Sequence, residues 1–132
     1  MPYQRTIDKD GIIITRVTGD VHAADSFLAI KELESYIKNR QLAEIVLHDP
    51  AVRVSLSFSD NEKSKKIADK TFKNADRAVI ALVSEKDPVF ALCRQLQVMM
   101  KNEKIHVNVF RTEESARVWV NKIRSEALAE SK

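Results

Sequence analysis

Short apolar runs alternate with segments of helical periodicity along most of this chain, and that alternation restricts the possible folds more than any other feature. Residues 45–47 and 78–83 are continuous apolar runs, which are typical of strands buried on both faces of a sheet. Residues 105–110 alternate between apolar and polar, as expected of a half-buried edge strand. Strands connected through helices pair in parallel with right-handed crossovers, so we expect a largely parallel sheet covered by helices.

The N-terminal segment follows a different pattern. Residues 4–7 and 12–17 have the character of strands, and the turn-forming sequence at residues 8–11 separates them. This predicts an antiparallel hairpin at the start of the domain. The complete prediction is an α/β fold with a mixed, mostly parallel five-stranded sheet and four helices, in the order strand, strand, helix, strand, helix, strand, helix, strand, helix.

Three of the predicted helices have a clear apolar face. They are expected at residues 27–40, at residues 87–102 after an Asp-Pro start, and from residue 113 to about residue 127, where we expect the tail to fray. The apolar faces consist of Phe27, Ile30, Leu33, Tyr36 and Ile37 in the first, of Val89, Leu92, Cys93, Leu96, Met99 and Met100 in the second, and of Ala116, Trp119, Val120, Ile123 and Ala127 in the third.

Composition narrows the class of protein. A chain of 132 residues with 44% hydrophobic residues is expected to form one domain, residues 1–132, around one core. A net charge of +3 is too small for the field of a dedicated nucleic-acid binder, so we expect no nucleic-acid partner. The N-terminus lacks an apolar signal and no run could cross a bilayer, which favours a cytoplasmic location. A lone cysteine, Cys93, agrees with a reducing compartment and argues against a metal site.

The segment between the first buried strand and the lysine-rich helix is the first place to look for function, because ligands and modifications collect beyond the carboxyl ends of parallel strands. It carries three alternating serines. We expect Ser55 and Ser57 to point outward from an extended segment, with Val54, Leu56 and Phe58 facing inward. Ser59 is expected to cap the second helix, because Ser59 and Glu62 have the spacing of a capping box.

The chain carries a resemblance to a known family. The resemblance is sharpest at residues 78–83, 89–101, 107–111 and 113–120, and it includes the sequence Phe110-Arg111 followed by Glu113-Glu114 and Trp119. It covers nearly the whole chain, which resembles the small SpoIIAA-like branch of the STAS family of anti-sigma-factor antagonists. The resemblance implies a mixed sheet with helices packed on it. It also implies a serine, at the helix start after the strand at residues 45–47, that a kinase partner phosphorylates.

In bacterial members of that family the phosphorylated serine lies in an Asp-Ser-Ser-Gly turn. The nearest equivalent here is the sequence at residues 58–61, which makes Ser59, and Ser57 one step away, the candidate phosphoacceptors. The sequence departs from the family pattern, since no glycine is near, Asp60 replaces the second serine and the loop is longer. A phosphate on Ser59 would gain from the helix dipole and be repelled by Asp60 and Glu62.

The leading functional hypothesis is a non-enzymatic regulatory module that binds a protein, an anti-sigma-like kinase or another regulator, through this loop and the following helix. Its surface would include Asp49, Arg53, Asp60, Lys63 and Lys66. The lysines of the second helix could meet an acidic partner or anionic lipid at a membrane surface. Acidic residues interrupt them, however, and this favours a solvated helix face over a binding face. The sequence does not decide between a monomer and a homodimer.

The alternative hypothesis is binding or carriage of a small apolar ligand or lipid. SpoIIAA-like domains resemble the CRAL-TRIO lipid-transfer fold, and the helix at residues 87–102 is apolar over more than one narrow stripe. Phe90, Leu96, Met99 and Met100 would contact the ligand, with methionine adapting to its shape. Ordinary core packing accounts for the same stripe. An exposed flat surface would favour the first hypothesis, and an enclosed apolar cavity the second.

An enzymatic function has little support in the sequence. His48 and Asp49 are adjacent on an extended segment, so their side chains diverge and cannot form a base and its orienting partner. Cys93 lies on an inward stripe, where an inert thiol is common, and His106 is expected to face water. Two glycines provide no phosphate-binding loop. We therefore expect neither catalysis nor a cofactor.

Overall fold

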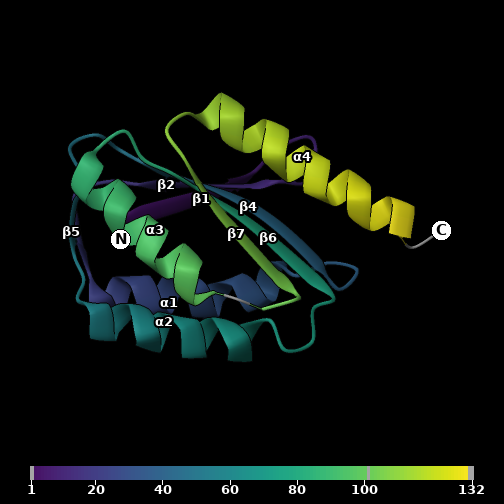
Figure 1. Ribbon diagram of the computed structural model, residues 1–132, viewed down its shortest axis with the longest axis horizontal. Helices are drawn as coiled ribbons and strands as arrows, with labels where there is room; N and C mark the ends of the chain where they lie inside the picture. Colours follow the sequence, from purple (N-terminus) through teal and green to yellow (C-terminus); the bar gives the residue numbers. More distant parts are fainter. Residues whose placement is uncertain (1, 101, 131–132) are drawn as a thin grey trace.

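The structure is a computed structural model that describes residues 2–100 and 102–130, the side chains of 127–130 excepted. Strands and helices alternate along the chain in the predicted manner (Figure 1). The elements are β1 Tyr3–Ile7, β2 Ile13–Val17, β3 Asp20–His22, α1 Ala23–Glu32, the 3-10 helix η1 Leu33–Tyr36, β4 Gln41–His48, β5 Arg53–Ser55, α2 Phe58–Thr71, β6 Arg77–Val83, α3 Asp87–Met99, β7 Ile105–Phe110 and α4 Glu113–Glu130.

Five strands form one mixed sheet in the order β1-β2-β4-β6-β7. The first two strands are antiparallel, and the remaining three neighbouring pairs are parallel. The predicted α/β class, the hairpin and the mostly parallel sheet with four α-helices are therefore confirmed. Strand β7 lies at an edge of the sheet, as its alternating sequence predicts.

A second, two-stranded sheet was not predicted. Strands β3 and β5 pair in parallel, with Asp20 opposite Arg53, and these two side chains form an ion pair at 2.7 Å. Each strand has only three residues, too few for a periodic signal in the sequence. The pairing holds the segments after β2 and β4 side by side, so that α1 and α2 begin next to each other.

The large sheet separates two layers of helices. Figure 1 shows α4 on one face, with α1 and α2 on the opposite face, where α3 also packs. Because side chains alternate along a strand, β4 directs Ala43 and Ile45 to the α4 side and Leu42 and Val46 to the other. Two hydrophobic cores result, of which the one under α1, α2 and α3 is the larger.

Helix α4 covers its face with the predicted stripe. Ala116 and Val120 are fully buried, and the ring of Trp119 packs against Phe110 with centroids 5.6 Å apart. The side chain of Ala127 lies outside the described residues. The backbone stays helical to Glu130, beyond the expected end of the helix.

The first helix is shorter than predicted. Helix α1 ends at Glu32 and continues as the 3-10 helix η1, instead of reaching residue 40. The helical segment ends at Tyr36, because Ile37 is extended with φ −66° and ψ 124°. Asn39 and Arg40 then turn the chain into β4 with positive φ angles of 54° and 62°. Strand β4 in turn is longer than the apolar run at residues 45–47, because it includes Glu44 and the polar residues at its ends.

Candidate functional site

A cavity of about 160 Å³ lies between the sheet and helices α1, α2 and α3. Most of its lining is apolar. The sheet contributes residues such as Val46, Ile80 and Leu82, and the helices contribute Ala29, Leu96 and others. An engineered cavity of about 150 Å³ with an apolar lining takes up benzene, so this space is large enough for a small organic molecule.

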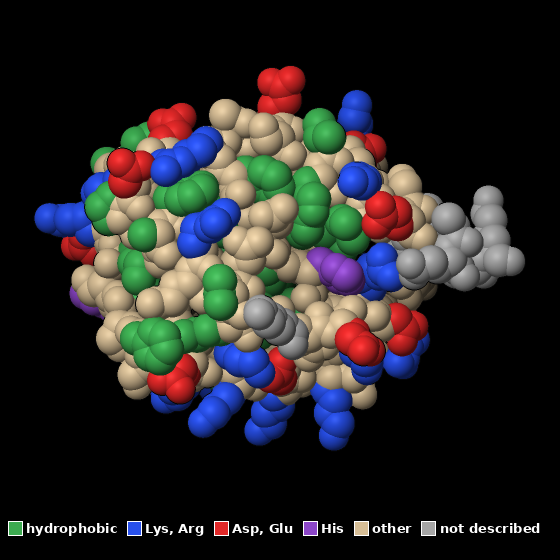
Figure 2. Space-filling model, viewed as in Figure 1, with side chains coloured by type: hydrophobic (Ala, Val, Ile, Leu, Met, Phe, Trp, Pro, Cys, Tyr) green, Lys and Arg blue, Asp and Glu red, His purple; other side chains and the backbone are tan. Residues whose placement is uncertain are grey.

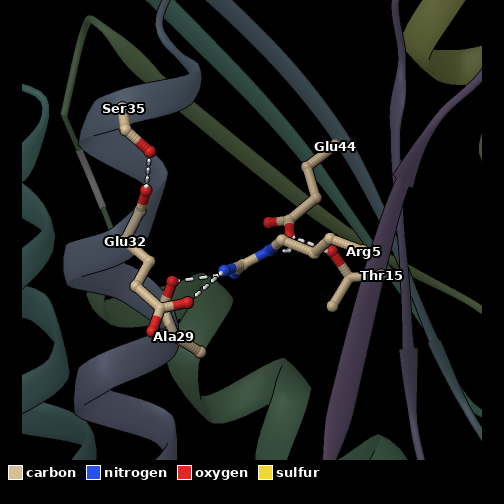
Figure 3. Close-up of polar contacts among 6 residues, drawn as sticks. All are labelled: Arg5, Thr15, Ala29, Glu32, Ser35 and Glu44. Atoms are coloured by element: carbon tan, nitrogen blue, oxygen red, sulfur yellow. Dashed lines mark hydrogen bonds and ion pairs between the residues drawn. The ribbon is translucent and has the colours of Figure 1, made fainter.

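One end of the cavity is polar. Arg5, Thr15 and Glu44 come from the neighbouring strands β1, β2 and β4 and meet beside α1 (Figure 3). The Thr15 hydroxyl donates to Glu44 Oε2 at 2.5 Å and accepts from Arg5 Nε at 3.2 Å. Arg5 Nη2 lies 3.5 Å from the same carboxylate oxygen. We call these three residues the polar cluster.

The polar cluster is almost completely buried. The side chains of Arg5 and Glu44 are 6% and 3% exposed, and Thr15 is buried as well. Arg5 is also held from the helical side, because Nη2 donates to the Ala29 carbonyl at 2.7 Å and the guanidinium lies 5.1 Å from the Tyr3 ring centroid. Arg5 is thereby fixed between the sheet and α1, and its charge faces the carboxylate.

Burial of the polar cluster changes the pKa of Glu44. Desolvation raises the pKa of Glu44, an effect that the charge of Arg5 and the hydrogen bonds from Thr15 and Arg5 oppose. Oxygen Oε1 of Glu44 has no hydrogen-bond partner among the described residues, and the residue lines the cavity. The cluster therefore offers an unfilled acceptor to whatever occupies the cavity.

Further polar side chains line the cavity, namely those of Tyr3, Asp25, Ser26, His48 and Asn61. The Tyr3 hydroxyl is buried and has no hydrogen-bond partner among the described residues, whereas Asn61 and His48 have one each. Asn61 is buried and donates from Nδ2 to Gln95 Oε1 at 2.8 Å. His48 donates from Nδ1 to the Val83 carbonyl, with a separation of 3.0 Å. Burial lowers the pKa of His48, against the effect of that hydrogen bond, so the ring is neutral at pH 7.

The structure divides the four residues that were predicted to contact an apolar ligand. Leu96 and Met100 line the cavity, whereas Phe90 and Met99 do not. Phe90 packs against the guanidinium of Arg111, whose Cζ lies 3.8 Å from the ring centroid. Two residues of the predicted inward stripe of α3, Leu96 and Met100, thus line the cavity, whereas Met99 of the same stripe and Phe90 do not.

The serine loop differs from the prediction in its helix cap. Ser57, not Ser59, is the N-cap of α2: its hydroxyl accepts from Asp60 N at 3.1 Å, and Asp60 Oδ2 accepts from Ser57 N at 2.8 Å. The predicted Ser59 cap is therefore wrong. Ser57 is exposed with an extended backbone, as predicted, and it also caps the helix. Phe58, expected to face inward, is 57% exposed, because it is the first residue of the helix. Ser55 does point outward from β5.

The residues of the predicted interaction surface lie at different places along the loop and α2. Asp49 closes the turn after β4 by accepting from Ala51 N at 2.8 Å, and Arg53 is paired with Asp20. Lys63 lies over the Phe27 ring at 4.8 Å, and Lys66 is exposed. Figure 2 shows Lys and Arg side chains projecting along the edge over α2.

The groups considered for catalysis do not come together. Cys93 is buried, and burial raises the pKa of its thiol to about 12. His106 is half-buried instead of facing water, on the face of the sheet opposite to the cavity. Within residues 2–100 and 102–130, no group of three or more His, Cys, Asp or Glu residues could hold a metal ion. Every helix in this part of the chain is too short or too polar to cross a bilayer.

Sequence reasoning missed the polar cluster, although one signal was present. Glu44 stands between Leu42 and Val46 at the spacing of one strand face, so a strand that includes it must bury a carboxylate. No family model, curated protein or solved structure matches this chain. The structure is therefore that of an α/β protein with a mainly apolar cavity between its sheet and helices α1, α2 and α3.

Proposed function

We propose that this protein binds a small apolar molecule in the cavity between the sheet and helices α1, α2 and α3, without catalysing a reaction. The observation that carries the proposal is the cavity itself. Its volume of about 160 Å³ and its mainly apolar lining suit a compact molecule of about the size of benzene. Native interiors rarely leave a space of this size empty, because each lost contact costs free energy.

Helix α1 is the covering element that would open most easily. None of its ten residues, all of which are described, is buried, whereas α2 and α3 each contribute buried residues. Ala29 and Ile30 of α1 nevertheless line the cavity. An element with few buried contacts can separate from the core at a low free-energy cost. Entry of the ligand beneath α1 follows from this difference.

Toluene is a suitable probe for the proposed function. We expect it to raise the melting temperature, with a stabilisation of about 1.4 kcal/mol when free toluene is ten times its dissociation constant. Leu96→Phe places extra volume in the cavity and is expected to weaken toluene binding at least tenfold. Ala29→Leu fills the same space from the opposite wall.

Val98→Phe is the matched control, since Val98 lies on the same helix, is 63% exposed and does not line the cavity. This variant should bind toluene like the wild type. Circular dichroism verifies that each variant is folded. Lack of saturable toluene binding by the wild-type protein would refute the proposal, as would an equal loss in Val98→Phe.

A second candidate function is the regulatory protein interaction expected of a STAS-type module. The observation that favours it is Phe58, a large apolar side chain that is 57% exposed at the start of α2, next to Ser59 and close in sequence to the exposed Lys63. Aromatic side chains flanked by charge are frequent anchors of protein interfaces. Intact-mass measurement of the protein from its own cells tests the phosphorylation part, and Ser59→Ala should remove any phosphate-sized increase. A mass that equals the unmodified chain in every growth phase would count against the switch.

A further inference from the structure

The polar cluster determines which chemical group the occupant of the cavity can carry. Glu44 is 2% exposed, and both of its hydrogen bonds to the cluster end on Oε2. Figure 3 shows the other carboxylate oxygen turned away from Thr15. A carboxylate oxygen accepts two hydrogen bonds, and Oε1 receives none from the described residues where Glu44 lines the cavity. A donor on the occupant would fill this position.

Four of the five N–H donors of Arg5 are already engaged. Nε donates to Thr15, Nη2 donates to the Ala29 carbonyl, and Nη1 lies 3.5 Å from Glu32 Oε2. The single positive charge of Arg5 thus faces two carboxylates, those of Glu44 and Glu32. A third carboxylate, Asp25, lines the cavity and accepts from the backbone N–H of His22 at 3.0 Å.

This charge balance disfavours an anionic occupant. An entering carboxylate would add another negative charge beside Glu44, Glu32 and Asp25 without a free positive partner. An ammonium group would have to give up its hydration next to the guanidinium of Arg5, which is unfavourable for like charges. A neutral hydroxyl group can donate to Glu44 Oε1 without adding a negative charge to the cavity and without placing a positive charge next to Arg5.

We propose that the ligand is a small apolar molecule with one hydroxyl group, which donates to Glu44 Oε1, and that the cavity rejects carboxylic acids. This inference rests on the proposed function, because it assumes that a ligand enters the cavity. It adds the polar group that the ligand carries and the residue that selects it.

Three probes of similar size test the selection: phenol, toluene and benzoate, each titrated into the full-length protein at pH 7 by calorimetry. Phenol is expected to bind at least tenfold more tightly than toluene, as a hydrogen bond to a charged acceptor implies. Benzoate is expected to bind at least tenfold more weakly than toluene. These measurements on the wild-type protein need no variant.

Glu44→Gln tests whether Glu44 is responsible. Because the Thr15 hydroxyl accepts from Arg5 Nε, it must donate to the new side chain, so the amide oxygen faces Thr15 and the NH₂ group faces the cavity. The preference for phenol over toluene should fall, because phenol can then only accept a neutral hydrogen bond from the NH₂ group instead of donating to the carboxylate. Benzaldehyde, which only accepts hydrogen bonds, should gain affinity relative to toluene. Asn61→Ala, a polar lining residue outside the polar cluster, should keep the wild-type preference.

The possible failures are distinguishable. If toluene binds and phenol binds no better, the hydroxyl assignment is wrong while the proposed function stands. If benzoate binds as tightly as phenol, the charge argument is wrong. If none of the probes binds, the proposed function fails and this inference fails with it. A preference for phenol that persists in Glu44→Gln and disappears in Asn61→Ala would assign the selection to Asn61 instead.

Discussion

Replacing Arg5 with methionine should destabilise the protein, and much more so at pH 7 than at pH 5. Arg5 and Glu44 are 6% and 3% exposed, with Nη2 and Oε2 3.5 Å apart. Without Arg5, Glu44 must stay charged in the interior or take up a proton. Removing one partner of a buried pair typically costs about 3–5 kcal/mol. Methionine keeps much of the apolar volume, so most of the cost comes from the carboxylate.

Protonation sets an upper limit on that cost. The ordinary pKa of the carboxyl is 4.5, so keeping it protonated at pH 7 costs about 3.4 kcal/mol, from 2.5 pH units at about 1.36 kcal/mol each. At pH 5 the same limit is about 0.7 kcal/mol, and the destabilisation should therefore be up to about 2.7 kcal/mol smaller. The hydrogen bonds lost at Thr15 and Ala29 add about 1 kcal/mol each at both pH values.

The sign follows from the direction of the pKa shift. Burial raises the pKa of Glu44 in the folded state, and loss of Arg5 raises it further. A raised pKa means that the folded protein binds the proton more tightly than the unfolded chain does. The stability associated with that proton is fully present below pH 4.5 and is lost as the pH rises through the folded-state pKa.

Urea unfolding of four proteins at pH 5 and pH 7 measures these terms: wild type, Arg5→Met, Glu44→Gln and the double variant. The double variant lacks the titrating carboxyl, so it should be more stable than Arg5→Met at pH 7. Arg53→Met is the control, because the ion pair of Arg53 with Asp20 is 77% and 52% exposed and should contribute less than about 1 kcal/mol at either pH. An equal cost of Arg5→Met at both pH values would refute the reasoning, as would a double variant no more stable than the single one.

Two further predictions concern the helix cap and the thiol. Ser57→Ala should lower the free energy of unfolding by about 1 kcal/mol, because it removes the N-cap of α2. Ser59→Ala should change the free energy of unfolding by less than about 0.5 kcal/mol. Chemical denaturation that gave the reverse order would contradict the assigned cap. Cys93 should not react with iodoacetamide at pH 8 in the native protein and should react once urea unfolds it, since burial raises the pKa of its thiol to about 12; mass spectrometry showing equal rates in both states would disprove this.

The N-cap of α2 could not be predicted from the local sequence. Both Ser57 with Asp60 and Ser59 with Glu62 have the spacing of a capping box, and their local free energies are similar. The choice depends on where the preceding strand stops. Strand β5 pairs with β3 as far as Ser55, which lets α2 begin at Phe58. That pairing joins segments more than thirty residues apart, so no local pattern could predict it.

The sequence by itself determined the class of fold, the antiparallel hairpin, the order of the four α-helices and of the five strands of the large sheet, and most of the inward stripe of α3. These follow from the periods of side-chain alternation, which a strand or a helix imposes on its own residues. Only the tertiary structure decided that Arg5, Thr15 and Glu44 meet, and that a cavity remains beside them. A cavity is the volume that side chains from distant segments leave unfilled. Its size and its polar end therefore depend on how α1, α2 and α3 pack against the sheet.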